Sequence, residues 1–398
     1  MIAKSIKLSL VSALLLCSSI YADDGFDEDD GFDEEDDFGG DEIVIQKVEQ
    51  EKKNNFIYFG SITASSDYSY SHQKEVSSVK LSGNLNLEYK INDKFKIKSA
   101  IKSYYDFRSR VSNDRDFDIN ELYIQGSLAS NIDIKIGRQI VVWGKSDNIR
   151  ITDTLNPMDM TKPGMVDIKD LRLGRVMSKL DYFKDDWSYS AILLHENRNS
   201  TLASRNSEYF MRPTIEEQSN KVSNTGIALS ANAALNGQDI SFYFANQYVD
   251  SKNYRSNMIG FAYNKVINSF LLKAEAAYFD NYDNETVDSK IDALLGLEYN
   301  GISDGSISFE LANKDETIQY ALRFTQSYVN QTIDFTALLS TYGKEFEDGG
   351  FIRVWGDYDY SDKISLSAGV INYIGGENVY FEKIKNNDRI FVSAKYSF

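Results

Sequence analysis

The residues that most often perform catalysis are scarce in this chain. Its 398 residues include two histidines, His72 and His195, and one cysteine, Cys17. General acid–base or nucleophilic catalysis needs partner side chains within hydrogen-bond reach of one another. His195 is followed by Glu196 and Asn197, but neighbours on a strand point to opposite faces. We therefore expect no enzyme activity, and so few nitrogen and sulfur ligands predict neither a metal site nor a cofactor.

Lysine and carboxylate side chains remain, and we expect them to steer solutes rather than react. Four lysines follow one another closely: Lys94, Lys96, Lys98 and Lys102. Four carboxylates come much later in the chain: Glu275, Asp292, Glu298 and Glu310. If both groups face an aqueous bore, a basic wall opposes an acidic wall, and the field between them orients polar solutes. This hypothesis requires elements that turn both groups inward.

Long strands are the elements that the sequence predicts. Apolar and polar residues alternate from Val79 to Ile91, and after Asn92-Asp93 the alternation resumes as far as Phe107. It also closes the chain, from Ile390 to Phe398. A period of two predicts β-strands. These are longer than the roughly five or six residues typical of soluble sheets and suit a tilted crossing of a bilayer.

The connections between the strands predict a barrel, because short and long ones alternate. The short set is Asn92-Asp93, Ser130-Asn131, Asp185-Asp186, Asn236-Gly237, Asn268-Ser269, Gly301 to Gly305, Asn330-Gln331 and Ser361-Asp362. The longer, polar set includes Arg108 to Asp116, Trp143 to Asp170, Glu196 to Lys221, Asp280 to Ser289, Gly343 to Gly349 and Gly375 to Asn387. Short periplasmic turns and long external loops are typical of outer-membrane barrels.

The predicted fold is therefore all-β: a transmembrane antiparallel β-barrel of about 18 strands over residues 56–398, with 16 strands as the alternative. We expect the last strand to pair with the first, near Phe56 to Tyr70, because closure removes both exposed edges. Aromatic residues near strand ends fit the interfacial girdles of such barrels. Examples are Tyr89, Phe107, Tyr278, Tyr299, Tyr358 and Tyr396.

The first 22 residues predict a cleaved signal peptide. Lys4 and Lys7 precede an apolar run that ends on the small residue Ala22. A lipid anchor on Cys17 is the alternative, although Leu16 is a poor fit before it. Elsewhere no stretch approaches the roughly 18 apolar residues of a spanning helix.

Residues 23–55 predict an acidic leader. Asp23 to Glu42 contain 13 acidic residues and no basic ones, so the formal charge of −17 falls to −6 over residues 43–398. Such a segment cannot bury enough apolar surface to fold, and we expect it to be disordered in the periplasm. Either it keeps the chain soluble, or its phenylalanines Phe26, Phe32 and Phe38 anchor a basic periplasmic partner.

The most distinctive segment joins the fifth and sixth strands. Its characteristic residues are Gly137, Arg138, Gln139, Trp143, Gly144, Asp147, Asn156, Pro157, Asp159, Asp170, Leu171 and Arg172. On these residues the chain resembles a family of uncharacterised, porin-like outer-membrane β-barrels of proteobacteria that is often found near exporters of the resistance-nodulation-division class. Many relatives carry an acidic residue directly after the Trp-Gly pair, where this chain has Lys145.

The loop from Trp143 to Asp170 is too long and too rich in Asp, Arg and Pro for a plain connector. We expect it to fold into the barrel mouth and narrow it, with an external lid as the alternative. The candidate lining residues are Arg150, Asp153, Asp159, Lys162 and Asp167. Trp143 is expected to anchor the loop against the barrel wall.

The leading function is passive diffusion of small hydrophilic solutes through a porin-like channel, since a barrel of this size can hold an aqueous bore. The alternatives are passage of hydrophobic compounds in partnership with an exporter, and a surface receptor or adhesin. The expected location is the outer membrane of a Gram-negative bacterium, with both termini in the periplasm. The expected partners are membrane lipid, lipopolysaccharide and the assembly machinery that recognises the strand ending at Phe398. A homotrimer is the open alternative to a monomer, and no basic stripe indicates nucleic-acid binding.

Overall fold

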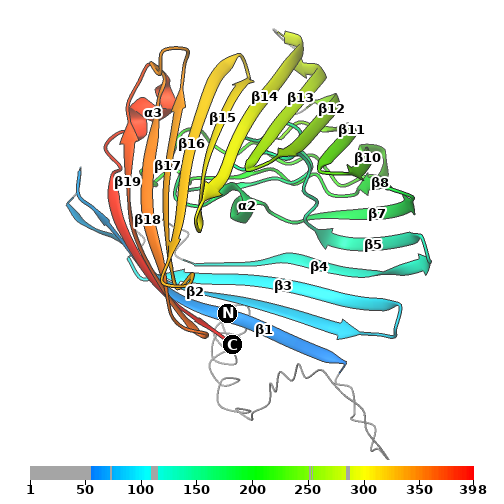
Figure 1. Ribbon diagram of the computed structural model, residues 1–398, viewed down its shortest axis with the longest axis horizontal. Helices are drawn as coiled ribbons and strands as arrows, with labels where there is room; N and C mark the ends of the chain where they lie inside the picture. Colours follow the sequence, from blue (N-terminus) through cyan, green and yellow to red (C-terminus); the bar gives the residue numbers. More distant parts are fainter. Residues whose placement is uncertain (1–54, 72–73, 109–114, 251, 253, 284–286) are drawn as a thin grey trace, which may run out of the picture. The chain divides into compact units, whose positions relative to one another are not determined.

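Eighteen long strands form one closed antiparallel sheet (Figure 1). The computed structural model describes residues 55–71, 74–108, 115–250, 252, 254–283 and 287–398. The predicted signal peptide, the acidic leader up to residue 54 and His72 therefore lie outside the described residues. The wall strands are β1 (Phe56–Ser69), β2 (Glu75–Lys90), β3 (Phe95–Asp106), β4 (Arg115–Ala129), β5 (Ile132–Gln139), β7 (Arg175–Lys184), β8 (Trp187–Leu194), β10 (Gly226–Leu235), β11 (Gln238–Tyr248), β12 (Arg255–Ile267), β13 (Phe270–Asp283), β14 (Val287–Ile302), β15 (Gly305–Lys314), β16 (Thr317–Tyr328), β17 (Ile333–Tyr342), β18 (Gly349–Ser361), β19 (Ile364–Ile374) and β20 (Arg389–Ser397).

The first and last strands close the barrel. β20 pairs with β1 in a register that runs from Ser61↔Ser397 to Ser69↔Arg389, and it pairs with β19 on its other side. The predicted closure and the count of 18 strands are confirmed, and the alternative of 16 strands is wrong. No wall strand is left with an open edge, which is how barrels avoid pairing with other chains.

The predicted short turns all fall between the strands that they were expected to join. Strict alternation of short and long connections is nevertheless wrong. β15 and β16 are joined at the long-loop end by two residues, Asp315 and Glu316, whose φ angles of 51° and 62° are typical of a tight hairpin turn. β13 and β14 also continue into the stretch expected to be a loop, to Asp283 and from Val287. At these two places the local sequence, and not the alternation of short and long connections, determines how the strands are joined.

The two faces of the wall have opposite character. On β14, Ile291 and Leu295 are 64% and 66% exposed on the outside, whereas Asp292 and Leu294 are 2% exposed on the inside. Several predicted girdle aromatics, including Tyr89, are also largely exposed. A surface with apolar residues outside and charged residues inside matches a barrel surrounded by lipid.

Two connections at the long-loop end run back into the barrel (Figure 1). The first joins β5 to β7 and contains β6 (Asp159–Met160) and the short helix α2 (Ile168–Leu171). The second joins β8 to β10 and contains β9 (Thr201–Leu202) and a 3-10 turn, η2 (Val222–Asn224). β6 and β9 pair in parallel and so tie the two loops together. A further helix, α3 (Val379–Ile384), lies between β19 and β20. Within the described part of the chain, no helix is long and apolar enough to span a membrane.

Candidate functional site: the loop inside the barrel

The loop between β5 and β7, which we call the inner loop (residues 140–174), is closed at its neck by Asn156. The side-chain oxygen of Asn156 accepts a hydrogen bond from the Val141 N–H at 2.9 Å, and its amide donates to the Leu173 carbonyl at 2.9 Å. The Pro157 carbonyl accepts from the Leu173 N–H at 2.8 Å. One buried side chain thus joins the two ends of the loop. This arrangement directs the residues between the two ends into the barrel.

Two carboxylates of the wall hold the inner loop. Glu275 of β13 accepts hydrogen bonds from the Ser146 N–H at 2.7 Å and from the Thr152 N–H and hydroxyl at 3.1 and 2.8 Å. Glu310 of β15 accepts from the N–H groups of residues 147–149 at 2.8 to 3.1 Å. Hydrogen bonds to a charged acceptor are stronger than neutral ones. The loop backbone is therefore fastened to strands far from its own neck.

The Trp-Gly pair packs against the wall as expected. The Trp143 ring, 4% exposed, stacks on Tyr243 of β11 with centroids 4.7 Å apart. The next residue, Gly144, donates its N–H to the Tyr243 hydroxyl at 3.2 Å and has a φ of +83°. A side chain at Gly144 would also collide with the Glu275 carboxylate. Trp143 thus lies against the barrel wall, in the position expected of an anchor.

The far end of the inner loop is tied by ion pairs. Asp167 receives Arg323 of β16 at 2.9 Å and Arg353 of β18 at 3.1 Å, one on each carboxylate oxygen. Lys162 reaches Asp67 of β1 at 2.7 Å. The loop thus makes contacts from β11 round to β1. It lies inside the barrel, and the alternative of an external lid is wrong.

The loop between β8 and β10, the second loop (residues 195–225), also spans the interior. Tyr209 packs edge-on against Tyr373 of β19, and Glu208 pairs with Arg389 of β20 at 2.6 Å. Burial raises the pKa of the Tyr209 hydroxyl well above its ordinary value, which Arg389 only partly offsets. Tyr209 therefore stays neutral and acts as a packing and hydrogen-bonding group.

The remaining motif residues shape the neck. Gly137 has a φ of +130°, and a side chain there would lie 2.3 Å from the Leu122 carbonyl. The fully buried Gln139 donates to the Met177 carbonyl at 3.1 Å, and Arg138 pairs with Glu196. Arg172 binds Asp153 at 2.8 Å. These residues support the neck of the loop and line neither of the two cavities described next.

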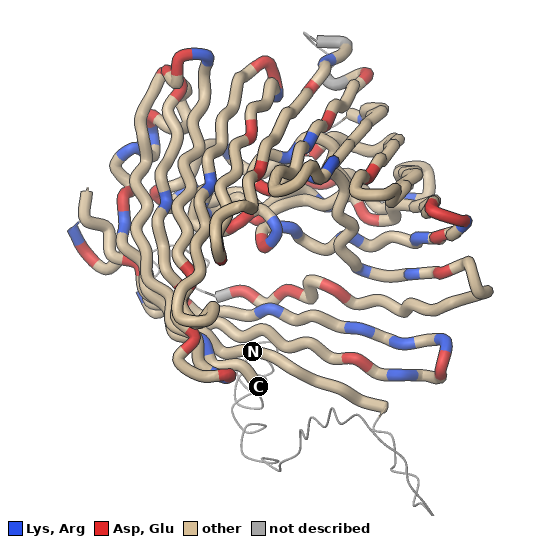
Figure 2. Tube along the Cα trace, in the orientation of Figure 1, with Lys and Arg blue, Asp and Glu red and all other residues tan. Residues whose placement is uncertain are grey.

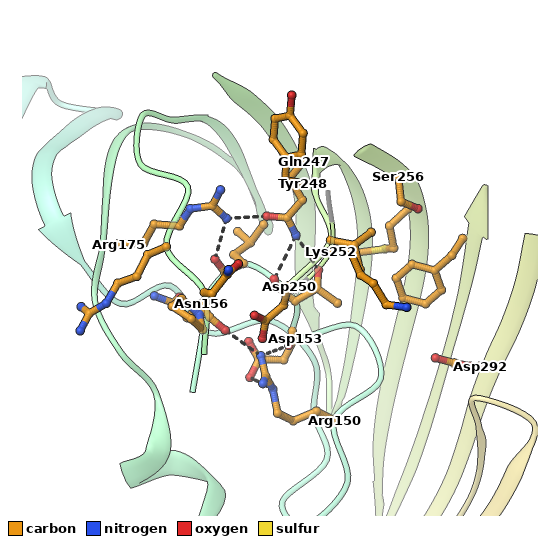
Figure 3. A pocket seen from close by; sticks show the side chains of 18 of the residues that line it. Arg150, Asp153, Asn156, Arg175, Gln247, Tyr248, Asp250, Lys252, Ser256 and Asp292 are labelled. Atoms are coloured by element: carbon orange, nitrogen blue, oxygen red, sulfur yellow. Dashed lines mark hydrogen bonds and ion pairs between the residues drawn. The ribbon is translucent and has the colours of Figure 1, made fainter. Parts of the chain in front are cut away.

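Two cavities adjoin the inner loop. The smaller has a volume of ≈ 280 Å³ and is lined by Arg150, Arg175, Gln247, Lys252 and other mostly polar residues. In Figure 3 the Arg175 guanidinium donates to Gln247, at 2.6 Å, and Arg150 faces Asp153. The larger has a volume of ≈ 510 Å³ and lies between the loop and β16–β18. The residues common to both linings are Arg150, Asp250 and Lys314.

Arg150 lies at the boundary between the two cavities, where it is charged and held in place. Burial lowers the pKa of its guanidinium, while Asp153 opposes that shift. An arginine so paired remains protonated at neutral pH. Its Nε donates to Asp153 at 3.1 Å, and its guanidinium also reaches the Asn156 carbonyl at 3.1 Å. The predicted lining role is thus matched in position by Arg150, and also by Asp153 and Asp167, which line one cavity each.

The other predicted lining residues have different surroundings. Asp159 accepts from the Thr161 N–H and hydroxyl, and with Lys162 it lies outside the linings of these two cavities. Lys96 and Lys98 pair with Glu88 at 3.1 and 3.0 Å. Figure 2 shows the basic residues that recur along β3. Lys94 lies in the turn before that strand, and Lys102 is exposed on it.

The four carboxylates of the expected acidic wall are all bonded to other groups of the protein. Glu275 and Glu310 are 3% and 1% exposed beneath the inner loop. Asp292 pairs with Lys290 at 2.7 Å, and Glu298 pairs with Lys273 at 3.0 Å. These four carboxylates therefore hold the loop or neutralise neighbouring lysines. They do not form an unscreened acidic wall.

The charged lining residues that the sequence did not reveal include Arg175, Asp250 and Lys314. Lys314 shares the inward face of β15 with Glu310, four residues earlier, so the period-two pattern could have found it. Asp250 and Arg175 are placed by long-range contacts, to Ser200 and Gln247 respectively. No local pattern indicates those contacts.

We expect Asp167→Asn to shift the ion selectivity of the barrel towards anions. The substitution removes the carboxylate shared by Arg323 and Arg353 and leaves two guanidinium groups with less compensation beside the larger cavity. The reversal potential in a salt gradient measures this shift. Asp116→Asn, which changes an exposed strand-end carboxylate by the same charge, is the control. An equal shift in both variants would contradict a local role for Asp167.

The family follows from comparison with known sequences. A family profile described as "Protein of unknown function (DUF1302)" matches residues 32–306. The chain belongs to this family. The match includes the inner loop and all of its motif residues. It confirms the resemblance to a family of unknown function that those residues suggested. No curated protein matches the chain.

Solved structures show similarity in fold. Acinetobacter baumannii OccAB2 aligns at a TM-score of 0.54 and 11% identity, over 86% of this chain and 98% of its own. Pseudomonas aeruginosa OccK8 (OprE) aligns at 0.53 and 9% identity, over the same shares. At such low identity the similarity concerns the barrel architecture alone.

In the ranges that the structure describes, no group of three or more His, Cys, Asp or Glu side chains could hold a metal ion. His195 accepts or donates a hydrogen bond with Ser178 at 2.8 Å. The charged groups that line the two cavities are Arg, Lys and carboxylate side chains.

Proposed function

We propose that this protein is a porin-type channel of the outer membrane of a Gram-negative bacterium, which admits small water-soluble solutes past the inner loop. The observation that carries the proposal is the attachment of that loop, across the interior, to Glu275 and Glu310. A connector with no role inside the barrel would not need two buried carboxylates. A loop held there reduces the free cross-section and brings Arg150 and Asp153 to its edge.

The outward apolar surface supports the membrane location, because the exposed Ile291, Leu295 and their counterparts would be unfavourable in water. The antiparallel pairing of β1 with β20 brings the beginning and end of the barrel to the short-turn end. In the proposed orientation this end faces the periplasm, and the two infolded loops enter from outside.

Single-channel recording tests the proposal. The full chain, purified and inserted into a planar bilayer, is expected to give discrete open steps, and a salt gradient gives the reversal potential. The inner loop predicts steps smaller than those of an unobstructed barrel of equal strand number. Protein shown to be folded by its heat-modifiable mobility, yet electrically silent at every voltage, would overturn the channel function.

A further inference from the structure

The larger cavity is lined in large part by apolar side chains. Its apolar lining comes from the inner loop, the second loop and the wall, including Ile149, Met158, Val166, Met211, Leu338 and Phe351. Its volume of ≈ 510 Å³ falls within the range of cavities that hold small organic ligands, about 300–1,000 Å³. A general porin bore does not require an apolar recess of this kind.

Two cations that line this cavity, Lys314 and Arg212, have no ion-pair partner among the described residues, and Lys314 is the less exposed of the two. Among the residues that the structure describes, no hydrogen bond or ion pair reaches the Lys314 ammonium. Two acidic residues whose charges act on Lys314, Asp292 and Asp315, each pair with Lys290. By contrast, Arg323 is paired with Asp167.

The carboxylates of the same lining are engaged. Asp167 holds two arginines, and Asp147 pairs with Lys273. Asp250 accepts the N–H of Ser200 at 2.8 Å and its hydroxyl. A cationic ligand would therefore compete with existing donors, whereas an anionic one would satisfy an ammonium that has no partner. Leaving a charged group desolvated and unpaired is costly, so a neutral apolar ligand alone would fit this cavity less well.

We infer that this cavity binds a small amphipathic anion, with its apolar body against the side chains around Leu338 and Phe351 and its anionic group on Lys314. The inference rests on the proposed function in that a solute passing the inner loop would meet this recess. It names the class of solute: a compact apolar skeleton with one carboxylate or similar anion. Lys314 also borders the polar cavity, so the anionic group would keep access to water.

Calorimetric titration of the full chain in lipid nanodiscs tests this inference without requiring conduction. The probe is 2-naphthoate, with empty nanodiscs subtracted. We expect saturable binding that Lys314→Gln weakens about ten-fold or more, because a hydrogen bond to a charged group is lost. Leu338→Asn, similar in size but polar, is expected to weaken binding as well. Lys102→Gln, an interior lysine outside both cavity linings, is the matched control and should bind as the unaltered protein does.

Two comparison ligands separate the contributions of the apolar body and the charge. Acetate lacks the body and is expected to bind far more weakly than 2-naphthoate. 2-Naphthylmethanol lacks the charge, and its binding should not respond to Lys314→Gln. No saturable signal above empty nanodiscs, equal binding of acetate, or equal loss in Lys314→Gln and Lys102→Gln would each overturn the inference. If the protein binds 2-naphthoate but conducts no current, the channel function is refuted and the binding site is still supported.

Discussion

Replacing Glu275 and Glu310 together by alanine is expected to raise the single-channel conductance several-fold. The two carboxylates accept hydrogen bonds from backbone N–H groups of the inner loop between Lys145 and Thr152. A hydrogen bond to a charged group contributes about 1.5–3 kcal/mol. Without these acceptors, water satisfies the N–H groups, and the loop loses its attachment to β13 and β15. The cross-section that it occupies then opens to ions.

Glu88→Ala is the matched control for this experiment. Glu88 of β2 is an interior carboxylate that pairs with Lys96 and Lys98. In the part of the chain that the structure describes, no hydrogen bond or ion pair joins it to the inner loop. Its removal should leave the size of the open step nearly unchanged. Circular dichroism and heat-modifiable mobility establish that each variant is folded. A folded double variant with the original conductance would show that the inner loop is not the constriction.

The second large effect is expected at Gly174, where Gly174→Ala should prevent assembly or cost more than about 3 kcal/mol of folding free energy. An added Cβ would lie 1.7 Å from the Asn120 carbonyl oxygen of β4. The Gly174 N–H donates to the Asn120 side chain at 3.1 Å, and its carbonyl accepts from Arg198 at 2.8 Å. The backbone at Gly174 cannot move away from β4 without disrupting the end of the inner loop and the start of β7.

Gly83→Ala provides the comparison, because the same added carbon meets only the Ser103 hydroxyl, at 3.5 Å. That distance is ordinary van der Waals contact, and we expect a change in stability within about 1 kcal/mol. The midpoint of urea unfolding in lipid vesicles measures both variants. Equal midpoints for Gly174→Ala and Gly83→Ala would mean that β4 and the loop end can separate without loss.

The apolar lining of the larger cavity bears on one alternative drawn from the sequence, the passage of hydrophobic compounds. Such passage needs an apolar surface inside the barrel, and the inward-facing apolar residues of the strands, such as Leu271 and Leu294, are scattered along the sequence. The recess instead takes much of its lining from the two infolded loops, with Met158 from one and Met211 from the other. Loop residues carry no period-two pattern that assigns them to the inside, so the strand pattern could not predict this surface.

The sequence by itself determined the barrel. The alternation of apolar and polar residues depends only on the two-residue repeat of an extended chain, so most of the strands, the short turns and the inward faces could be assigned locally. The closure of β20 on β1 followed from the same reasoning, because an unpaired edge is unfavourable. Lipid-facing and interior residues were therefore separable before any contact was known.

Only the tertiary structure decided what the interior holds. Glu275 was assigned to the inside, yet its partners Ser146 and Thr152 lie more than a hundred positions away in the chain. The same is true of Asp167 with Arg323 and Arg353. The sequence of a loop has no periodic pattern that determines its conformation. The hydrogen bonds and ion pairs that hold the inner loop form only once the barrel has closed around it. For that physical reason Glu275 and Glu310, which were expected to line an open bore, hold the inner loop instead, and Lys314 borders both cavities.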